Sequence, residues 1–232
     1  MPESSSQTRE ALLEAAQRLF SSRGYAEVGI REIAEQAGAN VASIKYYFGS
    51  KHDLYLESVR QAMGHYDGES LSEMLAEAPA DDAAAATQLV RFIQAFFHRS
   101  SQRREMDACG LLMLREALQP SEAIDAVVRD YLKPRTDDLV SVLGVLMPDT
   151  PGEELLNAAH WLLGQLMHFR IFRPFIERLS GIDFADEAVS RRVARSIAAF
   201  SLRGLGCDEQ TIENALHEAQ KQHTMTPRKA QA

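Results

Sequence analysis

The residues best suited to molecular recognition lie in one short run, VASIKYYF, which spans residues 41–48. If this run is helical, successive residues turn by about 100°, so Ile44 and Phe48 share one face. The opposite arc is made of Ala42, Ser43, Lys45 and Tyr46. That arc offers a hydroxyl, an ammonium group and a phenol beside a small side chain, so it is too polar to be only core. Such groups can form hydrogen bonds with a polar surface that approaches the helix.

A helix and a tight turn are expected directly before this run. The apolar stripe of the expected helix consists of Ile30, Ile33, Ala34 and Ala37. Gly38 can take the positive φ that a sharp helix stop requires, and Asn40 is a preferred N-cap for the helix that follows. Two short helices joined in this way, the second with a polar outer face, predict a helix-turn-helix that places side chains in the DNA major groove. A plain helical corner is the alternative interpretation.

Longer helices are expected on both sides of this motif. Residues 7–23 carry an apolar stripe that would support the helix-turn-helix. The members of the stripe are Leu12, Ala15, Ala16, Leu19 and Phe20. Ser50 followed by Asp53 has the spacing of a capping box, which opens a helix over residues 51–78 before Pro79. This second helix would connect a small N-terminal domain to the rest of the chain.

Apolar residues recur at helical spacing through the remaining chain without an alternating strand pattern, so an all-α fold is predicted. The further expected helices cover residues 83–101, 107–118, 121–146, 153–173, 184–205 and 209–223. Pro134 should kink or split the helix that contains it. The expected N-caps of the last three helices are Thr150, Asp183 and Asp208. The predicted domains are a DNA-binding domain over 1–55, a regulatory and dimerisation domain over 56–223, and a disordered tail over 224–232.

The net charge of −8 argues at first against a DNA-binding protein, because affinity for phosphate comes from Lys and Arg. The charge is unevenly distributed: residues 1–60 hold seven basic and eight acidic side chains, a net charge of −1. Between residues 41 and 52 there are two lysines, Lys45 and Lys51, and no acidic residue. A locally basic contact surface on an acidic body is therefore predicted, with salt-sensitive binding.

The remaining composition favours a cytoplasmic protein without a cofactor. Two cysteines, Cys109 and Cys207, are too few for a disulfide framework, and no apolar run is long enough to span a membrane. The serine-hydrolase elbow, the phosphate-binding loop and the zinc-protease motif do not occur. His160 and His168 would lie about 12 Å apart along a helix, which is too far to share one metal ion. We therefore expect no catalytic residues, no metal and no enzymatic activity.

The helix expected over residues 153–173 is apolar on nearly every side. A helix on a protein surface keeps one polar face, so this helix needs a second apolar partner besides its own domain. A second copy of the chain is the expected partner, and Gly164 would allow close approach of two helices. A central helix in a large monomeric core is the alternative.

Residues 1–60 resemble the DNA-binding domain of the TetR family of bacterial transcription regulators. The resemblance rests on three segments, ALLEAAQRLFSSRGY, IREIAEQAG and SIKYYFGSK, which occur in the order and at the spacing of the family. The run ANVASIKYYFGSKHDLY and the later segments LLMLREALQPS, LKPRTDDLV and GQLMHFRIFRP are similar to the YbiH/CecR-like members. The resemblance covers most of the chain. It implies an N-terminal three-helix domain joined by a long helix to a C-terminal ligand-binding and dimerisation domain.

The resemblance also implies roles for individual residues of the motif. The positions that commonly hold DNA backbone phosphates in the family are taken by Ser43, Tyr47 and Lys51. The positions that face base edges are taken by Val41, Ala42, Lys45 and Tyr46. Lys45 departs from the family, in which many members have Tyr, so it could bind guanine or add a phosphate contact. Gly29 also departs, because Ser or Thr usually caps the second helix, but Gly is a tolerable cap.

The implied function is a homodimeric repressor that a small-molecule effector releases from a pseudo-palindromic, double-stranded DNA operator. The dimer would form through a four-helix bundle of the helices near 153–173 and 184–205. A regulator that dimerises without a small-molecule inducer is the alternative within this class. From other classes, a protein-binding adaptor or a helical enzyme could keep the N-terminal domain as a scaffold, although the periodicity shows no clear cluster of catalytic carboxylates or histidines.

An effector site would lie between the helices of the C-terminal domain. Its candidate lining residues are Phe92, Phe96, Met113, Trp161, Gln165 and His168. For the aromatic residues and the methionine, ordinary core packing is the alternative. Gln165 and His168 would need polar partners, either in a ligand site or across the dimer. The arginines beside apolar runs are Arg115, Arg170 and Arg173. They could hold an anionic ligand, and salt bridges to carboxylates are their alternative use.

Overall fold

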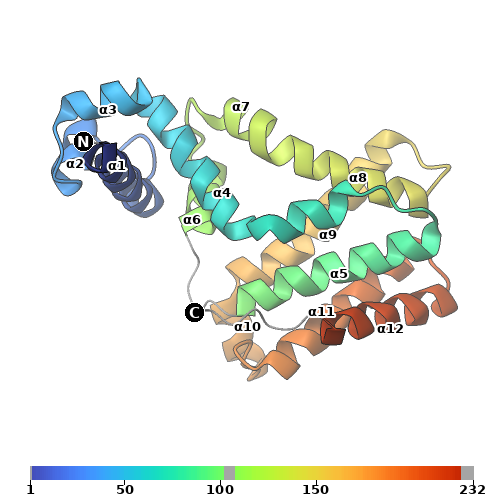
Figure 1. Ribbon diagram of the computed structural model, residues 1–232. Coiled ribbons are helices and arrows are strands. Elements are labelled where there is room, and N and C mark those ends of the chain that lie inside the picture. Colours follow the sequence, from blue (N-terminus) through green and yellow to red (C-terminus); the bar gives the residue numbers. More distant parts are fainter. Residues whose placement is uncertain (1, 102–107, 226–232) are drawn as a thin grey trace. The chain divides into compact units, whose positions relative to one another are not determined.

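In the computed structural model, which describes residues 2–101 and 108–225, the regular elements are helices (Figure 1). They are α1 (Pro2–Arg23), α2 (Ile30–Gln36), α3 (Val41–Phe48), α4 (Lys51–Ala76), α5 (Asp82–Ser101), α6 (Ala108–Leu118), α7 (Ile124–Val127), the π-helical segment η1 (Val128–Leu132), α8 (Lys133–Leu146), α9 (Gly152–Ile171), α10 (Arg173–Ser180), α11 (Glu187–Gly204) and α12 (Glu209–Met225). No strand occurs in the described residues, and the predicted all-α fold is confirmed.

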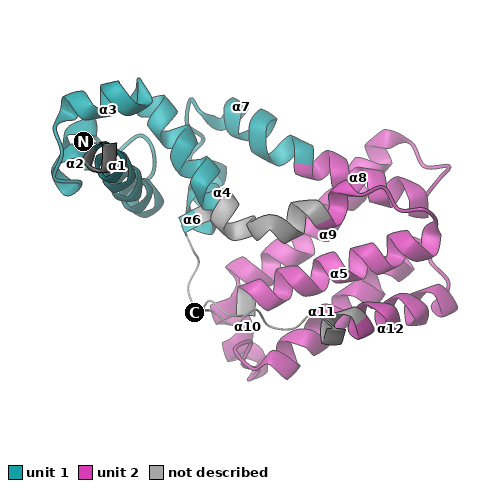
Figure 2. Ribbon diagram, in the orientation of Figure 1, with its two compact units in different colours: residues 1–68, 105–134 teal, residues 69–104, 135–232 magenta. Residues whose placement is uncertain are grey.

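The chain packs as two compact units (Figure 2). Unit 1 comprises Met1–Gly68 and Glu105–Pro134, and unit 2 comprises Glu69–Arg104 and Arg135–Ala232. The chain thus contributes to unit 1 twice, because α6, α7 and η1 pack with the N-terminal helices. The division into domains 1–55 and 56–223 follows chain order, differs from these packing units, and stays a prediction. Helix α12 extends to Met225, and the rest of the tail predicted over 224–232 lies outside the described residues.

Unit 1 has one hydrophobic core to which both of its chain segments contribute. The stripe predicted on α1 is buried, and Leu12 and Phe20 are fully enclosed. The other enclosed members include Ile33, Ala34, Ile44, Leu54, Tyr55, Val59, Leu112, Ala123 and Val127. Burial of each large apolar side chain stabilises the fold by about 1.5–3 kcal/mol. The predicted support of the helix-turn-helix by α1 is therefore confirmed, and α6 packs against α1 and adds Leu112 to the same core.

The turns around α3 form as the sequence predicts. Gly38 has a φ of 62°, a left-handed conformation that favours glycine. The side chain of Asn40 accepts a hydrogen bond from the amide of Ala42 at 2.9 Å and so caps α3. At the start of α4, the hydroxyl of Ser50 accepts a hydrogen bond from the amide of Asp53 at 3.0 Å. These bonds set where α3 and α4 begin.

Unit 2 is organised around α5, which lies against α9, α11 and α12. Figure 1 shows α5, α11 and α12 side by side. The buried side chains of this group include Leu89, Phe92, Ile93, Phe96, Ala194, Leu202, Ile212 and Leu216. Asp208 caps α12 as predicted, by accepting a hydrogen bond from the amide of Thr211 at 2.9 Å. In the described part of the chain, no helix has the length and apolarity needed to cross a bilayer.

Two predicted N-caps in unit 2 are wrong. Helix α9 has Pro151 as its N-cap, so Thr150 lies one residue too early. Helix α11 is capped by Asp186, whose side chain accepts a hydrogen bond from the amide two residues later at 2.8 Å. Asp183 makes the same local bond at 2.8 Å in the preceding turn. Both aspartates satisfy the local rule for a cap, and tertiary packing decides which of them begins the helix.

Two prolines shape the helices around them. The helix predicted over 121–146 is split, as expected from Pro134: α7 gives way to the π-helical η1, and Pro134 is the second residue of α8. A proline donates no backbone hydrogen bond, and the wider π turn lies next to the missing bond. Pro174 directly follows the helix predicted over 153–173, and it lies in the first turn of α10, an additional helix. Backbone N–H groups in the first turn of a helix have no partner within the helix, so a proline there costs no helical hydrogen bond.

Candidate nucleic-acid interface

Helix α3 presents the polar arc expected from its sequence. Tyr46 is 80% exposed, and Ala42 and Lys45 are also exposed, whereas Ile44 on the opposite face is 2% exposed. The helix is short, so its orientation depends on this buried side chain and on the cap at Asn40. A methyl, an ammonium and a phenol group therefore point away from the core of unit 1.

The other predicted contacts on α3 are half-buried. Val41 and Tyr47 pack partly against the core of unit 1, and Ser43 is also partly exposed. The Tyr47 hydroxyl lies 3.1 Å from the Ser5 hydroxyl at the surface. The Tyr47 ring meets the Tyr46 ring edge-on, with centroids 4.9 Å apart. Val41 therefore supports α3 as well as bordering its exposed arc, while Tyr47 keeps a polar group at the surface.

Lys51 is the first residue of α4, and its ammonium group lies over an aromatic ring of the same unit. Its Nζ atom is 4.3 Å from the centroid of the Tyr25 ring, which is a cation–π geometry. Burial lowers the pKa of Lys51, and the carboxylate of Glu122 acts in the opposite direction. Lys51 is thus partly desolvated, and its interactions with nearby anions are stronger than in bulk water.

An ion-pair network joins α1 to α4 beside α3. Glu57 accepts hydrogen bonds from Arg60 at 2.7 and 2.6 Å and from Arg9 at 2.7 Å. The bond from Arg60 first, and then that from Arg9, outweigh burial and lower the pKa of Glu57 to about 2. The Arg9 guanidinium also lies 5.2 Å from the centroid of the Phe48 ring at the end of α3. The network therefore helps to fix α3 between its neighbouring helices.

Helix α6 is attached to α1 and α4 within unit 1 by polar contacts. Arg115 donates from Nε to the carbonyl of Ser21 at 2.9 Å and from Nη2 to the carbonyl of Ser22. These carbonyl groups belong to the last turn of α1, where the helix dipole favours a cation. Tyr55 of α4 donates a hydrogen bond to the buried carboxylate of Glu116 at 2.7 Å.

The turn after α6 reaches the same part of unit 1. Glu116 accepts a second hydrogen bond, from the amide of Ser121 at 3.1 Å. The next residue, Glu122, accepts a hydrogen bond from the hydroxyl of Tyr25, whose ring lies under Lys51. Sequence analysis missed Tyr25 and Glu122, because they are 97 residues apart and no local pattern relates them.

The predicted effector residues are divided between the two units. In unit 1, Met113 packs against the hydrophobic core, and Arg115 is bonded to α1. In unit 2, Phe92 and Phe96 are buried on α5. Trp161 of α9 is 71% exposed. Within a single chain α9 therefore buries one side, which includes Leu162 and Leu166, and leaves Trp161 uncovered. Burial of this second side by another copy of the chain stays a prediction.

Gln165 and His168 also lie on the open side of α9. Gln165 is half-buried, and its Nε2 atom donates to the backbone carbonyl of Trp161 at 3.5 Å. The exposed His168 ring stacks on the Phe172 ring, with centroids 5.2 Å apart and planes inclined by 23°. Both residues were expected to need a polar partner because α9 was expected to be mostly buried. In this chain Gln165 bonds to a backbone carbonyl, and His168 is exposed and needs no protein partner.

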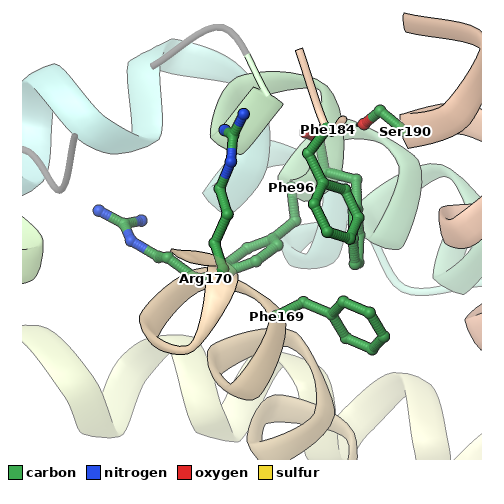
Figure 3. A pocket seen from close by; sticks show the side chains of 7 residues that line it. Phe96, Phe169, Arg170, Phe184 and Ser190 are labelled. Carbon is green, nitrogen blue, oxygen red and sulfur yellow. Dashed lines mark hydrogen bonds between the residues drawn. The ribbon is translucent and has the colours of Figure 1, made fainter. Parts of the chain in front are cut away.

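A small cavity in unit 2 is lined by aromatic rings and two arginines (Figure 3). Its walls are Phe96, Phe97, Phe169, Arg170, Arg173, Phe184 and Ser190. Arg173 is 8% exposed, bonds to Glu177 at 2.8 Å, and lies over the Phe184 ring at 5.8 Å. The volume open to the centre of a water molecule is about 10 Å³, so the cavity has room for one water. Small-molecule sites usually hold ~300–1,000 Å³, so the cavity is too small for an effector in this conformation.

Large apolar side chains are exposed on α9, α10 and α11 of unit 2. They are Leu156 and Trp161 on α9, Phe175 and Leu179 on α10, and Phe200 on α11, together with Phe172 between α9 and α10. Exposed apolar patches of this kind mark interaction surfaces in many proteins. Among residues 2–101 and 108–225, no group of three His, Cys, Asp or Glu side chains is placed to hold a metal ion.

Two family models match the chain. The model "Bacterial regulatory proteins, tetR family" matches residues 12–58, and "HTH-type transcriptional dual regulator CecR, C-terminal domain" matches residues 85–205. The chain is 28% identical to the transcriptional dual regulator CecR of Shigella flexneri over 200 residues, which cover 82% of this chain and 88% of CecR. It is 28% identical to the transcriptional regulator BetI of Rhizobium meliloti over 151 residues, 65% of this chain and 71% of BetI.

Solved structures share the fold at lower sequence identity. The fatty acid degradation regulator FadR from Bacillus halodurans superposes with a TM-score of 0.58 at 16% identity, over 84% of this chain and 98% of FadR. A complex of SmeT with triclosan superposes with a TM-score of 0.57 at 17% identity, over 82% of this chain and 90% of SmeT. At these identities the likeness concerns the fold alone.

Proposed function

This chain belongs to the TetR family of bacterial regulatory proteins, in its CecR-like branch, and we propose that it is a homodimeric repressor of a pseudo-palindromic operator. It is a DNA-binding transcriptional regulator and not an enzyme. The observation that carries the proposal is the arc of α3, on which Ala42, Lys45 and Tyr46 are exposed and no acidic residue occurs. As a repressor the protein would act in the cytoplasm.

Helix α3 is the recognition helix of this proposal. The exposed Lys45 and Tyr46 reach base edges in the major groove, where a lysine can donate to guanine O6 or N7. Ala42 contacts the same edges, and the half-buried Val41 borders them. The contacts to backbone phosphates come from Ser43, Tyr47 and Lys51. Their partial burial supports this division, because the phosphates flank the groove and the bases lie within it.

A second copy of the chain covers the exposed apolar surface of α9 and α11. Trp161 is 71% and Phe200 is 68% exposed, and burial of large aromatic rings is a main source of association energy. The interface corresponds to the bundle predicted near 153–173 and 184–205. Its two-fold axis sets the two α3 helices about one DNA turn, ~34 Å, apart.

A small-molecule effector binds unit 2 and releases the operator. Triclosan in the SmeT complex is a ligand of that protein, and here it supports only the general expectation of ligand binding. Because the cavity of this chain holds about one water, an effector has to select a conformation with more space. The same small cavity favours the alternative, a regulator that dimerises without an inducer. Thermal-shift screening separates the two, since any ligand of the native state raises the melting temperature.

The DNA role is tested by sequencing the genomic fragments that the purified protein retains, followed by mobility shifts on the recovered sites. We expect an inverted repeat, and the promoter upstream of the protein's own gene is a candidate site. If no fragment is enriched at low salt, the proposal is contradicted.

Matched lysine variants test the residue roles. Lys51→Ala should weaken binding to all sequences about equally and reduce the salt slope by about one unit. Lys45→Ala should change the preferred sequence. Lys221→Ala, on α12 of unit 2, removes the same charge and should change neither property. Unchanged affinity of Lys51→Ala, or an unchanged preference of Lys45→Ala, refutes the respective role.

A further inference from the structure

A carboxylate from the second segment of unit 1 lies beside the lysine proposed to hold a DNA phosphate. Tyr25 donates a hydrogen bond from its hydroxyl to Glu122, and Lys51 Nζ lies 4.3 Å from the centroid of the same ring. The charge of Glu122 favours the protonated form of Lys51, so the two side chains attract each other. The three groups come from the turn after α1, the start of α4 and the turn before α7.

The position of Glu122 is fixed by its neighbours in the chain. On one side, the amide of Ser121 donates to the Glu116 carboxylate, which is buried in unit 1. On the other side, Ala123 is fully enclosed in the core. Glu122 itself is exposed, but its backbone is held between two anchored residues. The hydrogen bond from Tyr25 then places its carboxylate at the ring over which Lys51 lies.

This arrangement opposes a phosphate contact in two ways. Glu122 attracts the Lys51 ammonium, so a phosphate has to compete for the same cation. Glu122 also repels any phosphate that approaches Lys51, because both are anions. Building on the proposed role of Lys51 in DNA binding, we propose that Glu122 lowers the affinity for DNA by competing with backbone phosphate for Lys51.

The test compares Glu122→Gln with a charge-matched control, Asp125→Asn. Glutamine keeps an oxygen that accepts the Tyr25 hydrogen bond, so the first variant removes the charge and retains the contact. Asp125 lies on α7, is exposed, and loses the same charge in the control. Binding is measured by fluorescence anisotropy over a range of salt, with the operator and with a random-sequence duplex, because phosphate contacts carry no sequence information.

We expect Glu122→Gln to bind both duplexes about two- to five-fold more tightly than the wild-type protein. Asp125→Asn should change affinity by less than about two-fold, because Glu122 is the carboxylate that acts on Lys51 and an exposed charge without such a contact is screened by salt. The gain from Glu122→Gln should fall to the level of the control in a Lys51→Ala background, since competition requires the lysine. Circular dichroism melting curves establish that each variant is folded.

Several outcomes overturn the inference. Equal effects of the two carboxylate variants, or a gain that survives Lys51→Ala, mean that Glu122 acts only through the overall charge. Weaker binding by Glu122→Gln means that the carboxylate positions Lys51 for phosphate and does not compete for it. If no protein binds either duplex, the DNA role itself fails. Binding without a difference between Glu122→Gln and Asp125→Asn refutes the inference alone.

Discussion

Replacement of Tyr55 by Phe isolates one buried hydrogen bond that joins α4 to α6 inside unit 1. Tyr55 is 1% exposed and donates across 2.7 Å to Glu116, which is 5% exposed. Phenylalanine keeps the ring and its edge-on contact with Phe20, whose centroid is 5.0 Å away. The variant therefore loses the donor with little change in packing, and it leaves a buried carboxylate with one partner fewer.

The expected cost follows from the burial of both groups. A hydrogen bond to a charged acceptor contributes about 1.5–3 kcal/mol, so we expect Tyr55→Phe to lower the free energy of unfolding by ~2 kcal/mol at pH 7. Urea denaturation followed by circular dichroism measures this loss of unfolding free energy, and the melting temperature should fall by about 4–8 °C. Glu116→Gln keeps an acceptor for Tyr55 and should cost less. Amide hydrogen exchange should accelerate in α4 and α6 and stay unchanged in α12.

The pH dependence gives a second check on the same bond. Burial first, and then the hydrogen bond to Glu116, raises the pKa of Tyr55 above its ordinary value. The folded state thus retains the proton more tightly than the unfolded state, and the Tyr55 contribution declines as pH rises above about 10. The stability difference from Tyr55→Phe should then narrow by up to ~1.4 kcal/mol per pH unit. This reasoning is refuted if the unfolding free energies of the wild-type protein and Tyr55→Phe differ by less than about 0.5 kcal/mol at pH 7. It is also refuted if their difference stays constant as pH rises above about 10.

Three further predictions concern the cap of α3, the ion-pair network and the dimer. Asn40→Ala removes a side-chain cap and should cost about 1 kcal/mol by calorimetry, and a variant as stable as the wild-type protein contradicts the cap. Glu57→Gln should cost about 1–2 kcal/mol at pH 7, a value reduced because the Arg60 partner is exposed. Because the pKa of Glu57 is lowered to about 2, its contribution to the free energy of unfolding is lost as pH falls from about 4.5 toward 2. A stability difference between Glu57→Gln and the wild-type protein that persists below about pH 2 in acid titrations counts against this prediction. Trp161→Asp should shift the protein to monomers in sedimentation equilibrium. Leu118→Asp changes a 72% exposed position in unit 1 and should leave the assembly unchanged. Equal behaviour of the two variants argues against a dimer through α9.

Local backbone chemistry explains which features could be predicted from the sequence. Gly38, Asn40 and Ser50 act on groups a few residues away, so their roles follow from residue type and spacing. The exposure of Lys45 and Tyr46 follows from the rotation of 100° per residue once Ile44 is placed inside. These signals define most of the candidate interface without any knowledge of long-range packing.

Long-range packing determines the surroundings of Lys51, and no local signal predicts it. Arg115 was a candidate for an anionic ligand because it follows an apolar run. In the structure its Nε atom bonds to the carbonyl of Ser21, a residue 94 positions earlier in the chain. The Tyr25–Glu122 contact also depends on the return of residues 105–134 to unit 1. Such contacts follow from the topology of the whole chain, which residue spacing does not specify.

Net charge and local charge act over different distances, and this difference reconciles an acidic chain with DNA binding. At physiological ionic strength the screening length is about 8 Å, so carboxylates farther than this from a phosphate contribute little. Close to α3, Glu57 is paired with both Arg9 and Arg60, and residues 41–52 contain no acidic side chain. The net charge of −8 therefore acts mainly at low salt, where screening extends to about 30 Å. Repulsion by the acidic body then weakens binding that depends on phosphate alone, whereas an operator adds base contacts that are independent of net charge.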